Sequence, residues 1–196
     1  MKFTLQNAFP TQASSESLWI LVDSEQLQQN LNTYQINHLD DVLNATQYKA
    51  GFNDNLALLA NVSVQANTQL LGLGKSDELK ATKLAKLAQS IIKSSQNKFK
   101  QISIDLSALP ADLHALFVLS LTQAAYGYDE FKSKKNEFVL ETIHLIASQT
   151  TLDEAQLKLI HAVQSGQNFA RDLGNRPGNI CFPEYLADQA LALAKQ

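Results

Sequence analysis

Short apolar runs alternate along this chain with longer segments in which apolar residues recur at the spacing of a helix. Each run is bounded by polar residues, as expected of a strand in a covered sheet. The runs predict strands at residues 3–5, 18–22, 56–60, 69–73, 101–106 and 138–147. Helical spacing predicts helices at residues 23–31, 38–46, 77–92, 110–126 and 151–175, and another that starts near Pro183. This alternation is typical of an α/β fold, a sheet flanked by helices.

Two of the helical patterns have an N-terminal capping signal. Ser76 and Asp77 are suited to cap a helix whose apolar stripe is formed by Leu79, Leu84, Leu87, Ala88, Ile91 and Ile92. Thr151 and Glu154 have the spacing of a capping box, which predicts that Thr151 caps the next helix. The apolar positions of that helix predict one continuous stripe formed by Leu152, Ala155, Leu159, Val163, Phe169 and Leu173.

A cluster of turn-forming residues follows the helix at 151–175. Gly174, Pro177, Gly178 and Pro183 all lie within ten positions, which predicts a boundary between two domains. We therefore expect an N-terminal α/β domain at 1–150, a connecting helix at 151–175, and a linker with the first helix of a further domain at 176–196. No repeat of fixed period is visible.

Composition restricts the class of protein. Apolar residues make up 45% of the 196 residues and charged residues 18%, which is enough apolar side chain for a core and argues against disorder. The net charge of −3 disfavours a chain built as a whole to bind nucleic acid or an anionic membrane. The apolar run LWILV is far short of a membrane span, so no membrane partner is predicted. A single cysteine, Cys181, forms no internal disulfide and indicates a cytoplasmic protein.

The sequence GLGK at 72–75 lies between a predicted strand and a predicted helix. A phosphate loop at this place requires further glycines at fixed offsets, and these are missing. The pattern therefore favours a structural turn over a phosphate site.

The other candidates for chemistry lack partners at useful spacing. None of the histidines has the spacing of a zinc site, and Cys181 has no nearby cysteine. The histidines are His38, His114, His144 and His161. The carboxylates Asp153 and Glu154 lie at a predicted helix N-terminus, where negative charge complements the helix dipole. Nothing in the residues themselves forms a catalytic constellation.

Lysines at Lys80, Lys83 and Lys86 step by three along one predicted helix. Such a stripe is suited to contact phosphates, so these three are the candidate nucleic-acid contacts. A solvated helix face is the favoured interpretation, because the chain as a whole is acidic and attracts DNA weakly.

The segment QSGQNFARDLGNRPGNICFPEYLADQA resembles the interdomain segment of the leucyl aminopeptidases, the cytosol aminopeptidase family with a two-metal site. Members have a helix that ends in a run of the Arg/Lys-Asp-Leu-Gly/Val-Asn type, then a Pro-Pro-Asn turn, then a helix that starts near Tyr-Leu-Ala. The matching positions are Arg171, Asp172, Leu173, Gly174, Asn175, Pro177, Asn179, Tyr185, Leu186 and Ala187. Gly178 stands where a second proline is usual, which predicts a slightly looser turn.

Two segments further upstream strengthen the resemblance. AAYGYDEFKSKK is similar to the family's Tyr-x-Phe-x-x-Tyr/Phe-Lys-Ser-Lys segment, with matches at Tyr128, Phe131, Lys132 and Ser133. LLGLGKSDEL is similar to its central strand and turn. The three matches lie in the family's order between about residues 70 and 190, whereas the residues before 70 contain no specific motif.

The resemblance implies a mixed sheet between helices, similar to macro domains, followed by a long connecting helix and a larger catalytic domain. In that family two divalent metals, Mn or Zn, polarise the scissile carbonyl and activate water in a peptidase that assembles as a hexamer. The metal-binding motifs of the catalytic domain do not occur in this sequence. No catalytic residue, metal ligand or cofactor site is therefore assigned to this chain.

Three hypotheses about function remain open. In the first, the chain is the N-terminal assembly and regulatory domain of a peptidase that releases residues such as leucine, inactive alone, with exposed apolar surface around Phe182, Tyr185 and Leu186. Its partners are then its own catalytic domain, further copies and peptide substrates. In the second, it is a nucleic-acid-binding module that uses the lysine stripe. The third, binding of ADP-ribose, rests on the fold alone.

Overall fold

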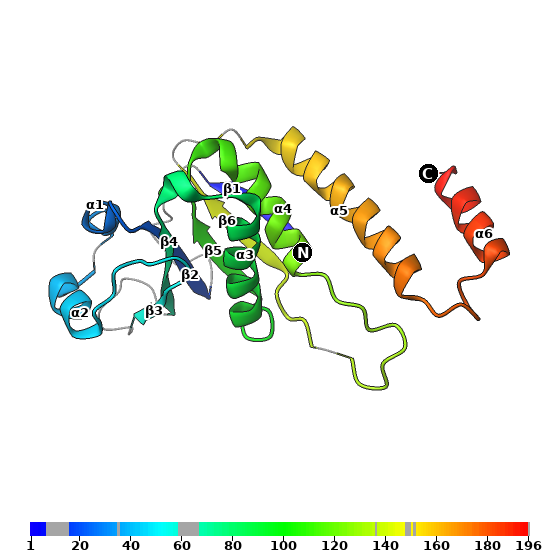
Figure 1. Cartoon of the computed structure of the whole chain (residues 1–196), viewed down its shortest axis with the longest axis horizontal. Helices are drawn as coiled ribbons and strands as arrows, with labels where there is room; N and C mark the ends of the chain where they lie inside the picture. The colour runs from blue at the N-terminus through cyan, green and yellow to red at the C-terminus, as the bar shows by residue number, and fades with distance from the viewer. Residues whose placement is uncertain are drawn as a thin grey trace.

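A computed structural model describes residues 1–6, 16–34, 36–58, 67–135, 137–147, 150 and 152–195. Its centre is a six-stranded sheet with the strand order β1-β6-β5-β2-β4-β3 (Figure 1). The strands are β1 (Lys2–Gln6), β2 (Ser17–Asp23), β3 (Asn55–Leu58), β4 (Thr68–Gly74), β5 (Gln101–Asp105) and β6 (Thr142–Ile146). Strand β3 is antiparallel to β4, and the other neighbours are parallel. The prediction of a mixed α/β sheet flanked by helices is confirmed.

The helices lie close to their predicted positions. They are α1 (Leu27–Leu31), α2 (Leu39–Thr46), α3 (Ala81–Ser95), α4 (His114–Ala124), α5 (Glu154–Asn175) and α6 (Pro183–Leu193). Two short 3₁₀ turns, η1 (Ser76–Glu78) and η2 (Ala111–Leu113), precede α3 and α4. Helix α5 extends from the sheet region, and α6 lies at its far end (Figure 1).

Strand β2 divides the core because every one of its residues is buried. Trp19 and Leu21 face the core under α3 and α4, where Leu87, Ile91, Phe117 and Leu121 pack. Leu18, Ile20 and Val22 face the opposite side, where Leu31 of α1 and Leu43 of α2 cover them. This alternation follows from the pleat of a strand, whose successive side chains point to opposite faces. A central strand covered on both faces is apolar at nearly every position.

Several predicted boundaries were wrong, and in three cases a hydrogen bond competes with the pattern. The helices predicted at 23–31 and 110–126 begin only at Leu27 and His114. The last strand begins at Thr142, since the amides of Val139 and Leu140 donate to the Gln96 carbonyl instead of joining the sheet. The helix after GLGK begins at Ala81, because 76–78 form a 3₁₀ turn, and neither Ser76 nor Asp77 caps it.

The N-cap of α5 is also displaced. It is Asp153, whose Oδ1 accepts from the Gln156 amide at 2.7 Å, rather than Thr151, which lies outside the described residues. Aspartate accepts a hydrogen bond from the first helical turn and complements the helix dipole. The charge role predicted for Asp153 is thus confirmed.

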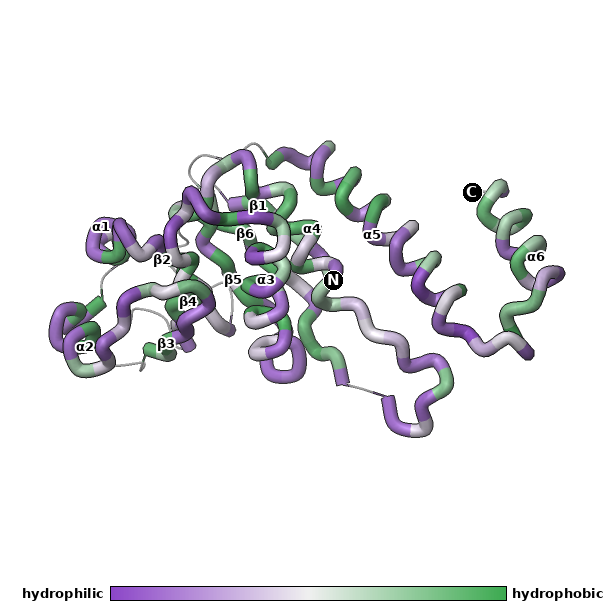
Figure 2. Tube along the Cα trace, in the orientation of Figure 1, coloured by the Kyte–Doolittle hydropathy of each residue, from purple (hydrophilic) through white to green (hydrophobic). Residues whose placement is uncertain are grey.

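The apolar stripe predicted for α5 was wrong, because a different face of the helix is buried. The buried residues of the helix are Leu157 and Ile160, neither of which was predicted, whereas Leu159 is 64% exposed and Val163 is also exposed. Of the predicted stripe Leu152 alone is buried, and it lies just before the helix begins. Figure 2 shows hydrophobic segments continuing along α5 and α6, away from the sheet. The sheet core therefore accounts for only the first part of α5.

Candidate functional site

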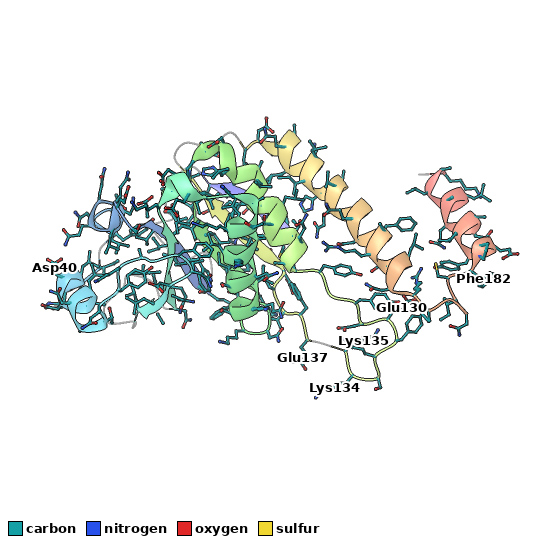
Figure 3. The ribbon with its side chains drawn as sticks, in the orientation of Figure 1. Asp40, Glu130, Lys134, Lys135, Glu137 and Phe182 are labelled. Atoms are coloured by element: carbon teal, nitrogen blue, oxygen red, sulfur yellow. The ribbon has the colours of Figure 1, made fainter. Side chains whose placement is uncertain are left out.

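The best candidate for a functional site is the place where the loop after α4 meets the end of α5 and the start of α6. We call residues 126–132, 172–177 and 182–185 the junction. Figure 3 shows Glu130 beside the end of α5, and Lys134 and Lys135 at the outer end of the loop. Two side chains of the junction, Tyr126 and Arg176, join these segments.

Tyr126 fastens the loop to the last turns of α5. Its hydroxyl donates to Asp172 Oδ1 at 2.8 Å and accepts from Asn175 Nδ2 at 3.0 Å. The guanidinium of Arg171 lies 5.0 Å from the centre of the Tyr126 ring, a favourable cation–π arrangement. Burial, followed by the bond to Asp172, raises the pKa of Tyr126, which extends to higher pH the range in which the hydroxyl donates.

Arg176 connects all three segments of the junction. It is the C-cap of α5, and its Nε donates to Glu130 Oε2 in the loop at 2.8 Å. Its Nη1 donates to the hydroxyl of Tyr185 in α6, and its Cζ lies 5.2 Å from the centre of that ring. The hydrogen bond from Arg176 lowers the pKa of Glu130, and the same bond raises the pKa of Arg176. Both groups are thus held in their charged forms.

The motif residues predicted from the family resemblance lie in or beside the junction. Asp172 and Asn175 hold Tyr126, and the Pro177 carbonyl accepts from the amides of Ile180 and Cys181 at 2.9 Å each. Asn179 is exposed in the same turn.

The remaining motif residues form contacts within the loop. Tyr128 donates to Glu130 Oε2 at 3.2 Å and meets Phe131 edge to face, with ring centres 6.1 Å apart. The Lys132 ammonium pairs with Asp129 at 2.6 Å. Phe131 itself is 52% exposed.

Sequence reasoning missed the role of three junction residues, namely Tyr126, Glu130 and Arg176, whereas Tyr185 was among the matched positions. Tyr126 is the first tyrosine of the AAYGYDEF segment and Arg176 lies between two matched positions, so their location was available from the sequence. The hydrogen bond between Glu130 and Arg176 was not available from the sequence, because the two residues are 46 positions apart.

Apolar side chains remain exposed around the start of α6. Phe182 and Leu186 are exposed, as expected for the apolar surface predicted there, and so are Leu191 and Leu193. Tyr185 is half-buried, because Arg176 covers its ring. Helix α6 contains no fully buried residue among those that the structure describes. This face differs from an ordinary surface helix, whose apolar residues pack on its own domain.

The predicted lysine stripe is spread over α3 and the residue before it. Lys80 and Lys86 are exposed. Lys83 pairs with Glu78 at 2.9 Å and lies 5.3 Å from the centre of the Phe52 ring. The middle cation is therefore partly neutralised and bound to its own domain.

The GLGK turn has a structural explanation. A Cβ on Gly72 would lie 2.1 Å from the Gly51 carbonyl oxygen, so only glycine allows this close approach of two backbones. Gly74 has a φ of +71°, in the region that favours glycine. The amides of both glycines are occupied, by the Asp54 and Ala50 carbonyls at 2.8 and 3.1 Å.

An internal carboxylate occupies the other amide that an anion would use beside this turn. The Ser76 amide donates to Asp23 Oδ2 at 2.9 Å, and the Glu25 amide donates to Asp23 Oδ1 at 2.7 Å. Asp23 is buried at the carboxyl end of β2. The geometry agrees with a structural turn, because the amides of Gly72, Gly74 and Ser76 already have acceptors within the chain.

The histidines make local structural contacts. His114 is buried between the Leu109 carbonyl and the Thr150 hydroxyl, and His144 bonds to Thr4 and Gln101 across neighbouring strands. Within the described ranges no group of three His, Cys, Asp or Glu residues is placed to hold a metal ion. These residues therefore do not fit a metal centre.

None of the helices that the structure describes has the length and apolar character needed to cross a bilayer.

Comparison with known proteins gives the family of the chain. Residues 21–135 match the family model described as "Cytosol aminopeptidase family, N-terminal domain". A protein of Acinetobacter baumannii named "Probable cytosol aminopeptidase" is 72% identical over 196 residues, which are 100% of this chain and 41% of that protein. The chain thus spans about two fifths of the length of this relative.

Solved structures share the fold. A mutant of tomato leucine aminopeptidase aligns with a TM-score of 0.78 at 19% identity, over 100% of this chain and 42% of that one. The bottromycin maturation enzyme BotP in complex with Mn aligns with a TM-score of 0.66 at 16% identity, over 93% of this chain and 36% of that one. With the match of the family model, these likenesses show that the chain belongs to the cytosol aminopeptidase family and contains its N-terminal domain.

Proposed function

We propose that this chain is the assembly and regulatory part of a metal-dependent aminopeptidase that releases N-terminal residues such as leucine from peptides. The observation that carries the proposal is the contrast between a closed sheet core and the exposed apolar residues of α5 and α6. A helix with such a face is stable in water when a second surface covers it. The division into 1–150, 151–175 and 176–196 and the likeness to macro domains remain predictions.

The partner proposed for this face is the catalytic domain of the same protein. The relative from Acinetobacter baumannii is more than twice as long as this chain, which supports a further domain. Helix α5 then acts as a spacer of 22 residues between the two domains, with Leu159 and Val163 available for contact. We further propose that the longer protein assembles as a hexamer and acts in the cytoplasm, in agreement with the single cysteine.

The metals belong, in this proposal, to the catalytic domain. The described residues do not fit a metal centre, so no step of the reaction is assigned to them. The manganese complex of the structural neighbour BotP supports a divalent metal, Mn or Zn, in the longer protein.

The test compares this chain with the longer product of its source gene. Both are assayed for release of leucine from leucine p-nitroanilide in the presence of Mn²⁺ or Zn²⁺, and both are sized by light scattering. We expect hydrolysis and a hexamer for the longer protein and no hydrolysis by the 196-residue chain. Metal-dependent hydrolysis by this chain alone would contradict the assignment, as would a longer product without peptidase activity.

Binding of nucleic acid by Lys80, Lys83 and Lys86 is the alternative. The ion pair between Lys83 and Glu78 weakens it, because a lysine that binds phosphate must give up this partner. A gel-shift series at low salt decides: a shift that weakens with salt and is lost in K80Q/K86Q would establish the alternative, and no shift would remove it.

A further inference from the structure

We propose that Arg176 is a positioning residue that locks the direction of α6 relative to α5 by binding loop 126–132. The lock is a property of this chain and does not depend on the peptidase assignment. Three observations carry it: the break between the helices, the anchoring of the loop, and the shared contacts of one guanidinium.

The backbone alone does not hold the two helices together. Arg176 leaves the helical region with φ −71° and ψ 136°, and Pro177 then prevents α5 from continuing. The N-cap of α6, Phe182, has no side-chain capping bond. The turn between the helices is held by the Pro177 carbonyl, which accepts from the Ile180 and Cys181 amides, so the direction of α6 depends on this short turn and on the side chains that join it to α5.

The loop gives Arg176 a fixed point. Tyr126 ties the start of the loop to Asp172 and Asn175, one turn before Arg176. The Lys132 amide donates to the Asp129 carbonyl at 3.2 Å, and the two side chains also pair, so the loop closes on itself around Glu130. Tyr128 shares the Glu130 carboxylate with Arg176. Glu130 is therefore positioned by groups other than Arg176.

Arg176 links the anchored loop to α6, because it contacts both Glu130 and Tyr185. The Cζ of its guanidinium lies 5.2 Å from the centre of the Tyr185 ring, while separate nitrogens donate to Glu130 and to the Tyr185 hydroxyl. Its side chain is only 19% exposed, so water competes less for these contacts than at an open surface. A planar guanidinium with several fixed donors makes such a three-way contact, whereas a lysine ammonium does not.

The experiment measures the angle between the helices in the complete 196-residue chain. Spin labels are attached at S165C in α5 and A190C in α6, in a C181S background, and their separation is measured by pulsed electron resonance. We expect one narrow distance distribution with Arg176 present. R176Q and R176K should broaden it at least twofold, and E130Q should do so to a smaller extent.

K158Q is the control. Lys158 is an exposed cation of the same helix, outside the junction. It should leave the distribution narrow. Hydrogen exchange on the same samples should show α6 amides exchanging about tenfold faster in R176Q, with β2 and β5 unchanged as proof of folding.

Several outcomes would overturn the lock. They are a broad distribution with Arg176 present, a narrow distribution in R176Q, and broadening by K158Q as large as that by R176Q. Loss of peptidase activity in a longer protein is not used as a readout. A result that contradicts the Arg176 lock therefore leaves the proposed function unaffected, and a longer protein without peptidase activity leaves the lock unaffected.

Discussion

The sheet region and the α5–α6 segment use similar apolar residues in opposite ways. Leu84, Leu87 and Ile91 of α3 are completely buried, whereas Leu186, Leu191 and Leu193 of α6 are exposed. Both helices have apolar residues at helical spacing, so the pattern alone does not separate them. The difference shows that α3 packs in the core of the sheet region, whereas no described part of this chain buries the apolar residues of α6.

The largest expected effect comes from removing one leucine from each region. Leu87→Ala should lower the free energy of unfolding by about 2–5 kcal/mol, because it leaves a cavity between α3 and the sheet. Leu191→Ala should change it by less than about 0.5 kcal/mol, since the side chain is already exposed. Urea denaturation followed by circular dichroism measures both. Similar losses for the two variants would show that α6 packs on this chain.

A second pair of variants compares two glycines. Gly72→Ala should lower the free energy of unfolding by about 1–3 kcal/mol, because its Cβ would press on the Ala50–Gly51 backbone. Gly166→Ala, in the middle of α5, has nothing within 4 Å of the added Cβ. It should stabilise the helix by about 0.5–1 kcal/mol. Thermal unfolding of the two variants should shift in opposite directions, and a harmless Gly72→Ala would refute the close approach.

A third pair compares two serines. The Ser95 hydroxyl accepts from the buried Trp19 indole at 3.1 Å, so Ser95→Ala should lower the free energy of unfolding by about 1–3 kcal/mol. Ser165→Ala on the exposed side of α5 should change it by about 0.5 kcal/mol or less. Trp19 fluorescence should change in the first variant alone. An unchanged spectrum and stability in Ser95→Ala would mean that the indole finds another partner.

The smallest expected effect is seen on titration with base. Burial strongly raises the pKa of Tyr34, with the carboxylate of Asp105 at 2.5 Å adding to it, and burial likewise raises that of Tyr48 beside Asp54. A raised folded pKa means that the neutral phenols contribute stability below the ordinary value near 10. This stability is lost as pH rises toward the folded pKa. The fold should therefore weaken above about pH 10.

Ultraviolet difference spectra of variants separate the two groups of tyrosines. Y34F and Y48F should remove absorbance that appears only when alkali unfolds the chain. Y126F and Y128F, at the junction, should remove part of the transition seen in the folded protein. A Tyr34 that ionised reversibly in the folded chain near pH 10 would contradict its burial.

Much of the fold was predictable because local signals agreed with it. Strand β2 consists of the apolar run 18–22 between the polar residues Ser17 and Asp23, a pattern that identifies a central strand. Pro183 at the first turn of α6 marks its start. The start of the last strand was not predictable, because the amides of Val139 and Leu140 find their acceptor at Gln96, in another element.

The location of the candidate site was predictable from the sequence, whereas the side-chain contacts within it were not. The family motifs identified the end of α5 and the loop at 126–132. Asp172 and Asn175 at the end of α5 do contact this loop, because both bond to the Tyr126 hydroxyl. The side chains that join the segments were missed, because side-chain contacts between distant residues leave no local spacing to detect. The lysine stripe was visible in sequence, whereas the partner of Lys83 was visible only in the structure.

The sequence by itself determined the α/β class, the approximate helices and strands, and membership of the family, since these depend on local periodicity and on short motifs. The tertiary structure decided which apolar residues of α5 and α6 remain uncovered, because burial depends on what packs across the helix. It also decided that Gly72 must admit a second backbone and that Arg176 joins three segments. Both depend on close approaches between parts of the chain that are distant in sequence, and only folding brings those together.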